Sequence, residues 1–429
     1  MASGVSLVIL AAGKGTRMKS ALPKVLHPLC GRSMLGWVMQ SALAVDPDRV
    51  VIVVGHGAEA VQAEAEKEAQ ELGLRGLEIV VQEEQKGTGH AVQVAAPALG
   101  PDPDIVLVLA GDMPLIRGDS IEELVRAQKE VGSDSMVVLT AELDDPHGYG
   151  RIVRDANDAL HAIVEQKDAS AEQLEICETN TGVYAFSGKR LLLDLPRLGT
   201  SNAQGEYYLT DLVGLAVDDG RPVVTVVLGD AFEGSGVNDL RQLAIVRQEL
   251  QFRILDEHMA AGVAVTDPGS AYVDHGVTIG EGTMLLPCVM IHRGVQIGKG
   301  CEVGPFAQLR PGTVMKDGSQ VGNFTECKNS EIGEGSKAKH LSYLGDAKIG
   351  KKTNIGAGTI FANYDGTHKH PTQVGDGVSI GSGSIIVAPN NLPDGLTTGA
   401  GAVITRDASI QAGETWVGMP AKPLRKKNN

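Results

Sequence analysis

The sequence contains few cysteines and no close pair of them. The five cysteines are widely spaced, at Cys30, Cys177, Cys288, Cys301 and Cys327. A disulfide framework or a structural zinc site would require cysteines in paired, closer spacings. The cysteines are therefore interpreted as free thiols in a reducing compartment.

Long apolar segments are also missing. The longest runs, such as residues 105–110, are far shorter than the roughly 18 residues needed to cross a bilayer. The apolar start at residues 5–12 has no basic segment before it and no evident cleavage site. We therefore expect a cytoplasmic protein without membrane insertion.

Positive charge is scarce relative to negative charge. Lys and Arg number 38, Asp and Glu number 53, and the formal net charge is -15. This charge opposes binding to nucleic acid or to an anionic membrane surface. It does not oppose a small anionic ligand in a local basic pocket, so we expect small-molecule substrates and no nucleic acid.

Aromatic residues make up only 3% of the chain, whereas glycine occurs 54 times in 429 residues. The apolar fraction of 42% is that of a globular protein, and the length predicts two or more domains. The excess of glycine indicates that part of the chain repeats tight backbone turns.

Residues 5 to about 230 alternate β-rich apolar runs with helical patterns. Strands are predicted at 5–10, 50–54, 77–81, 105–109 and 136–140, and helices at 35–45, 58–72 and 120–130. Continuous apolar strands separated by helices favour a mostly parallel, Rossmann-like sheet covered on both faces. Ligands of such sheets bind beyond the carboxyl ends of the strands. This half is therefore a candidate nucleotide-binding α/β domain.

Residues after 262 repeat with a different period. An aliphatic residue followed by a small or turn-forming neighbour recurs every six residues, as in Ile279-Gly280, Ile291-His292 and Ile297-Gly298. This period predicts a parallel β-helix of hexapeptide repeats, because each short strand points one aliphatic side chain inward and glycine permits the corner. Strands of a β-sandwich repeat at roughly 8 to 12 residues instead. The phase of the six-residue repeat shifts between residues 321 and 332, and residues 361–372 are predicted to form a loop.

The two halves are joined by a predicted helix. A polar, glycine-rich stretch at 229–236 precedes a helical pattern at 239–261. The predicted domains are therefore residues 1–229, a linker with the connecting helix at 230–262, and the β-helix at 263–429.

The first predicted strand leads directly into a glycine-rich turn at residues 13–17. Such a turn exposes backbone N–H groups to phosphate, and Lys14, Arg17 and Lys24 add positive charge. The turn matches neither the dinucleotide template nor the P-loop template, so a dehydrogenase and a P-loop ATPase are not indicated. The alternative interpretation is a tight turn with solvated basic residues.

Asp112 lies just past the predicted strand at 105–109, at the edge where ligands bind. Magnesium needs few protein oxygens, since it keeps waters and takes phosphate oxygens. Asp112 is therefore a candidate Mg²⁺ ligand. In the alternative, Asp112 only caps the turn that contains Pro114.

Several motifs together resemble one enzyme family. In the first half they are LAAGKGTRM at 10–18 with Pro23-Lys24, QKGTGHA at 85–91, Gly111-Asp112, GYGRI at 148–152, EQKD at 165–168, NTG at 180–182 and QGEYYLTD at 204–211. In the second half they are LRPG at 309–312, VGNFTECK at 321–328, GSKA at 335–338, HLSYLGD at 340–346, NIGAGT at 354–359 and NYDG at 363–366. Over nearly its whole length the chain resembles the bifunctional N-acetylglucosamine-1-phosphate uridylyltransferases and glucosamine-1-phosphate N-acetyltransferases. The resemblance implies an α/β nucleotidyltransferase domain followed by a left-handed parallel β-helix.

The resemblance implies a uridylyl-transfer site in the first half. It assigns nucleotide binding to Leu10, Ala11, Ala12, Gly13, Lys24, Gln82, Gly87 and Thr88, and catalysis at the phosphates to Arg17 and Lys24. It assigns sugar binding to Gly150, Glu165, Asn180 and Asn238, and Mg²⁺ to Asp112 and Asn238. No protein nucleophile is required, because a metal ion and fixed cations neutralise charge while the sugar phosphate attacks in line.

The resemblance implies an acetyl-transfer site in the second half. His340 would be the base, and the amino sugar phosphate would be bound by Arg310, Lys328, Tyr343, Asn354 and Lys369. The acetyl-CoA channel would be lined by Asn363, Tyr364, Ser382 and Ala400. An imidazole, with an ordinary pKa of about 6.5, suits proton acceptance from an attacking amine at neutral pH. We further hypothesise that Glu326 orients or polarises His340.

The end of the chain departs from the family. The family carries an arginine there that contacts the coenzyme, but the aligned residue here is about Val417. Two interpretations remain open for the basic residues that follow, which either supply charge to the 3′-phosphate of the coenzyme or form a solvated tail. They are Lys422, Arg425, Lys426 and Lys427.

The expected enzyme acetylates glucosamine-1-phosphate from acetyl-CoA and then couples N-acetylglucosamine-1-phosphate to UTP, giving UDP-N-acetylglucosamine and pyrophosphate. Its expected cofactor is Mg²⁺ and its expected assembly is a homotrimer, which such prisms commonly form. One alternative is a single-activity sugar-1-phosphate nucleotidyltransferase with a structural β-helix. A second is a noncatalytic nucleotide-binding regulator, against which Lys24, Asp112 and His340 argue.

Overall fold

The computed structural model describes residues 4–406 and 408–424. By its contacts the chain divides into two compact units, Met1–Arg247 and Gln248–Asn429. The division falls within helix α8 (Leu240–Ala260), where the connecting helix was predicted. The finer division into residues 1–229, 230–262 and 263–429 stays a proposal.

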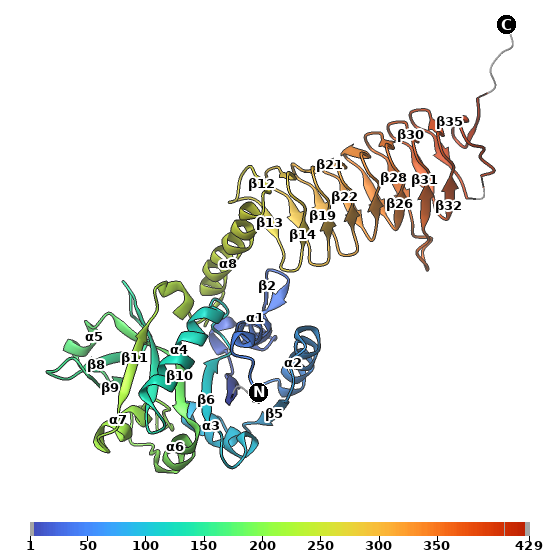
Figure 1. Cartoon of the computed structure of the whole chain (residues 1–429). Coiled ribbons are helices and arrows are strands. Elements are labelled where there is room, and N and C mark those ends of the chain that lie inside the picture. Colours follow the sequence, from blue (N-terminus) through green and yellow to red (C-terminus); the bar gives the residue numbers. More distant parts are fainter. Residues whose placement is uncertain (1–3, 407, 425–429) are drawn as a thin grey trace, which may run out of the picture. The chain divides into compact units, whose positions relative to one another are not determined.

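A mostly parallel sheet forms the centre of the first unit (Figure 1). Its order is β11 (Val223–Val227), β7 (Met136–Glu142), β10 (Glu178–Ser187), β6 (Ile105–Ala110), β1 (Val5–Ala11), β4 (Arg49–Val54) and β5 (Leu77–Val81). Strand β10 runs antiparallel to both of its neighbours, and β8 (Arg151–Arg154) and β9 (Leu160–Val164) form a hairpin beside it. A small separate ribbon pairs β2 (Pro28–Leu29) with β3 (Arg32–Ser33). The strands predicted from the sequence correspond to β1, β4, β5, β6 and β7, so that prediction is confirmed.

Helices cover both faces of this sheet because alternate strand residues point to opposite sides. They are α1 (Met34–Ala42), α2 (Ala58–Leu72), α3 (Thr88–Ala95), α4 (Gly118–Val131), α5 (Ala171–Leu174), α6 (Gly188–Asp194) and α7 (Asp211–Asp218). Leu7 and Ile9 of β1 belong to the core cluster under α1, α2 and α4, whereas Val8 belongs to the cluster under α3, α6 and α7. Single 3-10 turns lie at Thr16–Met18, Lys24–Leu26, Leu43–Val45, Ala96–Leu99, Leu195–Arg197 and Ala231–Gly234.

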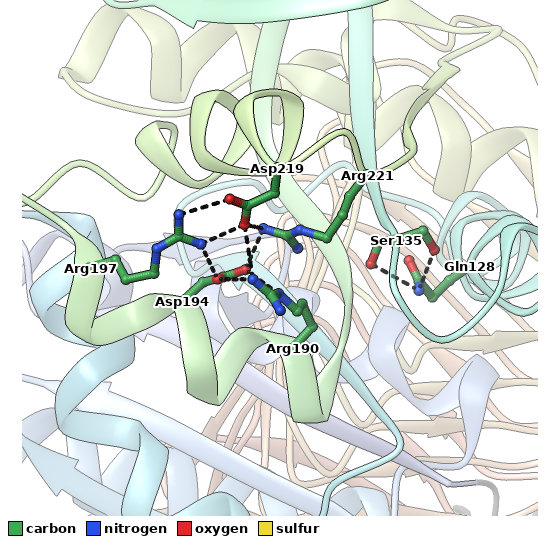
Figure 2. Close-up of polar contacts among 7 residues, drawn as sticks. All are labelled: Gln128, Ser135, Arg190, Asp194, Arg197, Asp219 and Arg221. Atoms are coloured by element: carbon green, nitrogen blue, oxygen red, sulfur yellow. Dashed lines mark hydrogen bonds and ion pairs between the residues drawn. The ribbon is translucent and has the colours of Figure 1, made fainter.

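Five charged side chains tie α6 to the segment between α7 and β11 (Figure 2). Asp194 accepts hydrogen bonds from Arg190 at 3.0 Å and from Arg197 at 2.9 Å. Arg197 also donates to Asp219 at 3.0 Å, and Arg221 lies 2.7 Å from Asp194. Two carboxylates are thus shared among three guanidinium groups. Each planar guanidinium has several N–H donors in one plane, which suits hydrogen bonds to carboxylates. We interpret the cluster as structural.

The second unit is a prism with three parallel sheets as its sides (Figure 1). The β12 sheet contains β12 (Ala264–Val265), β15 (Met284–Leu285), β18 (Glu302–Val303), β21 (Gln320–Asn323), β24 (Lys337–His340), β27 (Asn354–Ile355), β30 (Ser379–Ile380), β33 (Thr397–Thr398), β35 (Thr415–Gly418) and β36 (Ala421–Pro423). The β13 sheet contains β13 (Tyr272–Val273), β16 (Met290–Ile291), β19 (Gln308–Leu309), β22 (Glu326–Lys328), β25 (Tyr343–Gly345), β28 (Ile360–Ala362), β31 (Ile385–Val387) and β34 (Val403–Ile404). The β14 sheet contains β14 (Thr278–Ile279), β17 (Gln296–Ile297), β20 (Val314–Met315), β23 (Glu331–Ile332), β26 (Ala347–Ile349), β29 (Thr372–Val374) and β32 (Asn390–Leu392).

The length of a coil changes at two places. One full turn of the β-helix is called a coil. Gln296 pairs with Val314 on the next coil, so this coil spans three complete hexapeptide repeats. Val314 instead pairs with Glu331, which makes the next coil one position shorter. Ala347 pairs with Thr372, so that coil carries an insertion. The phase shift and the loop that the sequence predicted are therefore both confirmed.

The predicted fold class is confirmed: a mostly parallel α/β domain is followed by a hexapeptide β-helix of the left-handed, parallel kind. Among the described residues, no helix has the length and apolarity that a membrane crossing requires.

The inward aliphatic residues should carry most of the stability of the β-helix. Ile297 is buried and its strand neighbour Gln296 is exposed. We expect Ile297→Ala to lower the free energy of unfolding by about 2 to 5 kcal/mol, because it leaves a cavity. Gln296→Ala should change it by less than about 0.5 kcal/mol.

Denaturant unfolding would test this in a Trp37→Phe background, so that Trp416 alone reports on the second unit. Equal losses in the two variants would contradict the inward and outward alternation.

Candidate functional site

A cavity of about 390 Å³ opens at the carboxyl edge of the central sheet. It is formed by the ends of β1 and β6, the start of α3, and residues of β10 and of the segments that follow β9 and precede α7. Its lining residues are Leu10, Ala11, Ala12, Gly13, Lys14, Lys24, Val25, Gln82, Gln85, Gly87, Thr88, Ala91, Ala110, Asp112, Glu165, Asn180, Gly182, Tyr184, Glu206, Leu209 and Thr210. Ligands of parallel sheets are expected at this edge.

The glycine-rich turn holds Lys24 at this cavity. Gly15 has a φ of 59°, and a Cβ there would lie 2.7 Å from the Cβ of Lys24. Gly15 therefore needs to be glycine, both for its left-handed backbone and for the close approach of Lys24. Gly13 has no neighbouring atom within 4 Å of such a Cβ, which leaves its backbone open toward the cavity.

Lys24 connects the two residues predicted to bind metal. Its ammonium group forms an ion pair with Asp112 and donates a hydrogen bond to Asn238 Oδ1 at 3.2 Å. The backbone supports this arrangement, since Val237 N donates to the carbonyl of Asp112 at 2.9 Å. The oxygens of Asp112 and Asn238 therefore converge on one cation position.

That convergence fits a magnesium ion. Mg²⁺ binds through one or two protein oxygens and completes its coordination with water and substrate phosphate. Among the described residues, no group of three His, Cys, Asp or Glu side chains is arranged to hold a metal. A metal at Asp112 and Asn238 would thus depend on the bound nucleotide for further ligands.

One wall of the cavity is built by two segments that are distant in sequence. Gln82 Nε2 donates to the carbonyl of Gly87 at 3.1 Å, and Leu209 N donates to Thr88 Oγ1 at 3.1 Å. Gly87 has a φ of 106°, and a Cβ there would lie 2.5 Å from the carbonyl oxygen of Tyr207. Only glycine permits this approach, which keeps Gln82, Gly87 and Thr88 together on the wall.

A second part of the cavity lining carries Glu165 and Asn180, which were predicted to bind sugar. Asn180 Nδ2 donates to the hydroxyl of Tyr184 at 2.7 Å, and Asn180 N donates to the carbonyl of Gly150 at 2.9 Å. Burial raises the pKa of Glu165, against the opposing effect of the hydrogen bond from Thr210 at 3.4 Å. Burial also raises the pKa of the Tyr184 phenol. This part of the lining offers amide, carboxyl and hydroxyl groups suited to hydrogen bonds with a sugar.

Three predicted residues of this site do not line the cavity. Gly150 lies behind Asn180, Asn238 reaches it through Lys24, and Arg17 is exposed on the 3-10 turn that follows Gly15. Four polar lining residues had no assigned role in the sequence analysis: Gln85, Tyr184, Glu206 and Thr210. All but Tyr184 lie inside the motifs that carried the resemblance, so the motifs were a signal for them.

The second unit gathers cations at the carboxyl edge of the β13 sheet. Arg310 follows β19, Lys328 ends β22, and Lys369 lies on the loop after β28. Contact with Lys369, and to a lesser extent the charge of Arg310, lowers the pKa of Lys328, while Asp346 opposes that shift. Like charges held this close favour an anionic ligand between them. Tyr343 lies close to Lys328, because its hydroxyl crowds the position that a Cβ on Gly345 would occupy, and Gly345 is the register partner of Lys328.

His340 ends β24 in the β12 sheet and is exposed. Its Nδ1 lies 2.8 Å from the Oδ1 of Asn323, which ends the neighbouring strand β21. Glu326 was expected to orient His340, but it accepts a hydrogen bond from Arg310 at 2.7 Å instead. The prediction for Glu326 is therefore wrong, because the β13 sheet directs its carboxylate toward the cations. Asn323 lay within a recognised motif but was not singled out.

Asn363 is held by a chain of side-chain hydrogen bonds. Its Nδ2 donates to Asp346 Oδ2 at 2.6 Å, and Asn329 Nδ2 donates to Asp346 Oδ1 at 2.7 Å. Because Asp346 accepts from the Asn363 amide nitrogen, the Asn363 amide oxygen is left available to a ligand. Asn329, Asp346 and Asn363 follow β22, β25 and β28, so the chain of bonds crosses three successive coils.

The loop that carries Tyr364 and Lys369 is held by polar contacts of Asp365. Tyr364 and Lys369 face each other across an antiparallel bridge. The ring of His370 lies 2.6 Å from Asp365 Oδ2, and Arg406 lies 3.6 Å from the same oxygen.

The remaining predicted residues lie along the β12 sheet. Ser382 and Ala400 follow β30 and β33, at the same edge as His340. Asn354 begins β27 and pairs with Lys337, the first residue of β24. Asn354 is therefore at the opposite edge of the sheet from His340, and one chain does not bring it together with the cations.

The tail forms a short hairpin in which β36 pairs antiparallel with β35. Lys422 is the partner of Val417 across this hairpin and is exposed. The other basic residues considered for the coenzyme lie outside the described residues, namely Arg425, Lys426 and Lys427.

A cavity at the carboxyl edge of an α/β sheet and a cationic edge on a hexapeptide β-helix fit a nucleotidyltransferase joined to an acyltransferase. A family model described as a MobA-like NTP transferase domain matches residues 7–176. The Bifunctional protein GlmU of Stutzerimonas stutzeri (strain A1501) is 47% identical, and the match covers 90% of this chain and 91% of the relative. The GlmU of Azotobacter vinelandii (strain DJ / ATCC BAA-1303) is 47% identical, with 96% of each chain covered. The GlmU of Acinetobacter baylyi (strain ATCC 33305 / BD413 / ADP1) is 43% identical, with 90% of this chain and 89% of the relative covered.

The chain belongs to the family of bifunctional GlmU proteins. The resemblance read from the sequence is confirmed: the chain is an enzyme with a uridylyltransferase and an acetyltransferase activity. The roles of individual residues stay predictions.

Gly87 provides a test of the nucleotide wall. In Gly87→Ala the new Cβ would meet the carbonyl of Tyr207 in a backbone conformation that disfavours a side chain. We expect the KM for UTP to rise about tenfold to a hundredfold, since small displacements of a binding group cost that much. Acetyl transfer should be unchanged. The measurement is pyrophosphate release at varied UTP concentration.

A matched control is Gly214→Ala, in α7, where a Cβ would have no atom within 4 Å. An unchanged KM in Gly87→Ala would contradict the assignment of this wall to the nucleotide.

Proposed function

We propose that the chain makes UDP-N-acetylglucosamine in the cytoplasm by two successive group transfers at two separate sites. Acetyl-CoA first acetylates glucosamine-1-phosphate, and UTP then couples to N-acetylglucosamine-1-phosphate with release of pyrophosphate. The observation that carries the proposal is that each unit has its own cationic centre, with Lys24 in the cavity of the first and Lys328 beside Lys369 in the second.

In the first site, a phosphate oxygen of the sugar phosphate attacks the α-phosphorus of UTP. The new P–O bond forms as the bond from the α-phosphorus to the bridging oxygen breaks, and pyrophosphate leaves with the electron pair. Lys24 binds the phosphates from inside the cavity, and Arg17 from the exposed turn stabilises the charge that accumulates outside it. Gln82, Gly87 and Thr88 hold the uracil, and Glu165 and Asn180 hold the sugar.

Asp112 and Asn238 would hold a magnesium ion in this site. When bound, Mg²⁺ supplies positive charge to the reacting phosphates. Lys24, which forms an ion pair with Asp112 in this structure, would then turn its ammonium group toward the nucleotide phosphates.

In the second site, the amine of glucosamine-1-phosphate attacks the thioester carbonyl carbon of acetyl-CoA. The C–N bond forms and the proton of the amine passes to His340. As the carbonyl is restored, the C–S bond breaks, and coenzyme A leaves as a thiolate that carries the electron pair and then takes up a proton. Arg310, Lys328 and Lys369 bind the phosphate, assisted by Tyr343, and the free amide oxygen of Asn363 faces the substrate.

The coenzyme would lie along the edge of the β12 sheet. Ser382 and Ala400 lie at the same edge as His340, and Tyr364 would contact the coenzyme from the loop after β28. Lys422, opposite Val417, would supply positive charge to the 3′-phosphate.

The working assembly is a homotrimer in which neighbouring copies complete the acetyl-transfer site. Asn354 lies at the opposite edge of its sheet from His340, so it can bind the same substrate only from another copy. An exposed apolar ridge beside His340 suits such packing: Phe306 and Phe324 stack with ring centroids 5.2 Å apart, and Leu341 is exposed next to them.

Separate inactivation of the two sites tests the two-site proposal. Asp112→Ala should abolish pyrophosphate release while sparing acetyl transfer, since only the first site loses its carboxylate. His340→Ala should do the reverse. Acetyl transfer is measured as thiol release from acetyl-CoA in the presence of glucosamine-1-phosphate, with a blank that lacks the sugar.

Loss of both activities in either folded variant would rule out independent sites. Absence of sugar-dependent thiol release from the unaltered, folded enzyme would favour the alternative, a single-activity nucleotidyltransferase with a structural β-helix.

Mixed assemblies test the shared site. His340→Ala and Asn354→Ala chains, each impaired alone, should regain acetyl transfer when they are co-expressed. In a randomly mixed trimer about a quarter of the sites would combine an intact His340 with an intact Asn354 from another copy. Light scattering should give a mass of three chains. No recovery in a mixed trimer would place both residues in one chain.

A further inference from the structure

The partner of the His340 ring is a neutral amide. Asn323 Oδ1 lies 2.8 Å from His340 Nδ1, and an amide oxygen can only accept a hydrogen bond. The atom facing it must therefore be protonated, so the neutral ring carries its hydrogen on Nδ1. Its other nitrogen, Nε2, then has the free lone pair that a base requires.

This pair follows from the shortened coil. Gln320 pairs with Lys337, and the pairing continues to Asn323 and His340. Strands β21 and β24 therefore have four residues each. The other strands of this sheet up to β33 have two.

Gly322 permits this extension, because a Cβ there would lie only 2.0 Å from the carbonyl oxygen of Lys339. Leu341 N also donates to the carbonyl of Asn323 at 2.9 Å, which fixes the backbone of both residues. The register thus brings the Asn323 amide beside the His340 ring.

We infer that Asn323 is a positioning residue for acetyl transfer, which holds His340 in the tautomer that presents Nε2 as the base. The inference rests on the proposed role of His340. A neutral partner suits this role, because a carboxylate at the same place would stabilise the imidazolium ion and keep the ring protonated at neutral pH.

Charged groups around His340 are already paired or lie on its own strand. The flanking strands β21 and β27 contain no charged residue. On β24 itself, Lys337 is exposed and Lys339 lies 3.1 Å from Glu302. Glu326, on the neighbouring β13 sheet, accepts a hydrogen bond from Arg310.

Two variants of Asn323 separate positioning from a merely structural role. Asn323→Ala removes the acceptor, so the hydrogen distributes over both ring nitrogens. We expect kcat for acetyl transfer to fall about tenfold, within the range that general-base catalysis contributes. The KM for glucosamine-1-phosphate should stay within about twofold, since the phosphate-binding residues are unchanged.

Asn323→Asp keeps an acceptor and adds charge. The acid limb of the rate profile, where activity rises as the base loses its proton, should move to higher pH by about one unit. Activity above that limb should exceed that of Asn323→Ala, because the tautomer is restored.

Both variants would be assayed as full-length protein over pH 5 to 9 by thiol release, with uridylyl transfer as the check of folding. Lys337→Ala, at the other end of the same strand, is the matched control and should match the unaltered enzyme. An undiminished kcat in Asn323→Ala, or an unmoved acid limb in Asn323→Asp, would overturn the inference. Absence of acetyl transfer in the unaltered enzyme would instead overturn the proposed function.

Discussion

Both candidate sites depend on one constraint, the common direction of hydrogen-bonded parallel strands. In a parallel sheet every strand ends at the same edge, so residues that follow distant strands meet there. This brings Asp112, after β6, to the turn that follows β1. In the β-helix it aligns Arg310 and Lys328 at the ends of successive strands. The same geometry thus gathers cations in two unrelated folds.

The sequence predicts the scaffold better than the partners of individual side chains. Apolar runs and the six-residue period are local signals, and the structure confirms the strands and the coils drawn from them. Strand β10 was not predicted, because its antiparallel place between β6 and β7 is set by pairing with distant residues. Glu326 was assigned to His340 wrongly because spacing does not reveal which face of the prism a side chain occupies. That depends on coil length, and the shortened coil pairs His340 with Asn323.

The chain carries a net charge of -15, yet cationic side chains lie in both candidate sites. Each site keeps its cations in place with acidic or amide partners: Asp112 with Lys24, and Glu326 with Arg310. A cation held by a partner is oriented before the substrate arrives, so less side-chain entropy is lost on binding. The ligand then competes with this partner for the cation. Because the surface around the sites is negative, long polyanions are repelled more than small phosphates.

The two reactions place different demands on charge: phosphate transfer requires a cation, and acetyl transfer requires an uncharged base. The side chains at the two candidate sites differ in the same way. Phosphate displacement accumulates negative charge, so a permanent cation such as Lys24 beside a carboxylate suits it. Acetyl transfer needs a base that is neutral before it acts, so a charged neighbour would impair it. His340 is therefore paired with an amide, while the carboxylate of Glu326 is directed to Arg310. His340 lies on the β12 sheet and Glu326 on the β13 sheet, so separate faces of the prism hold the proposed base and the cations proposed to bind phosphate.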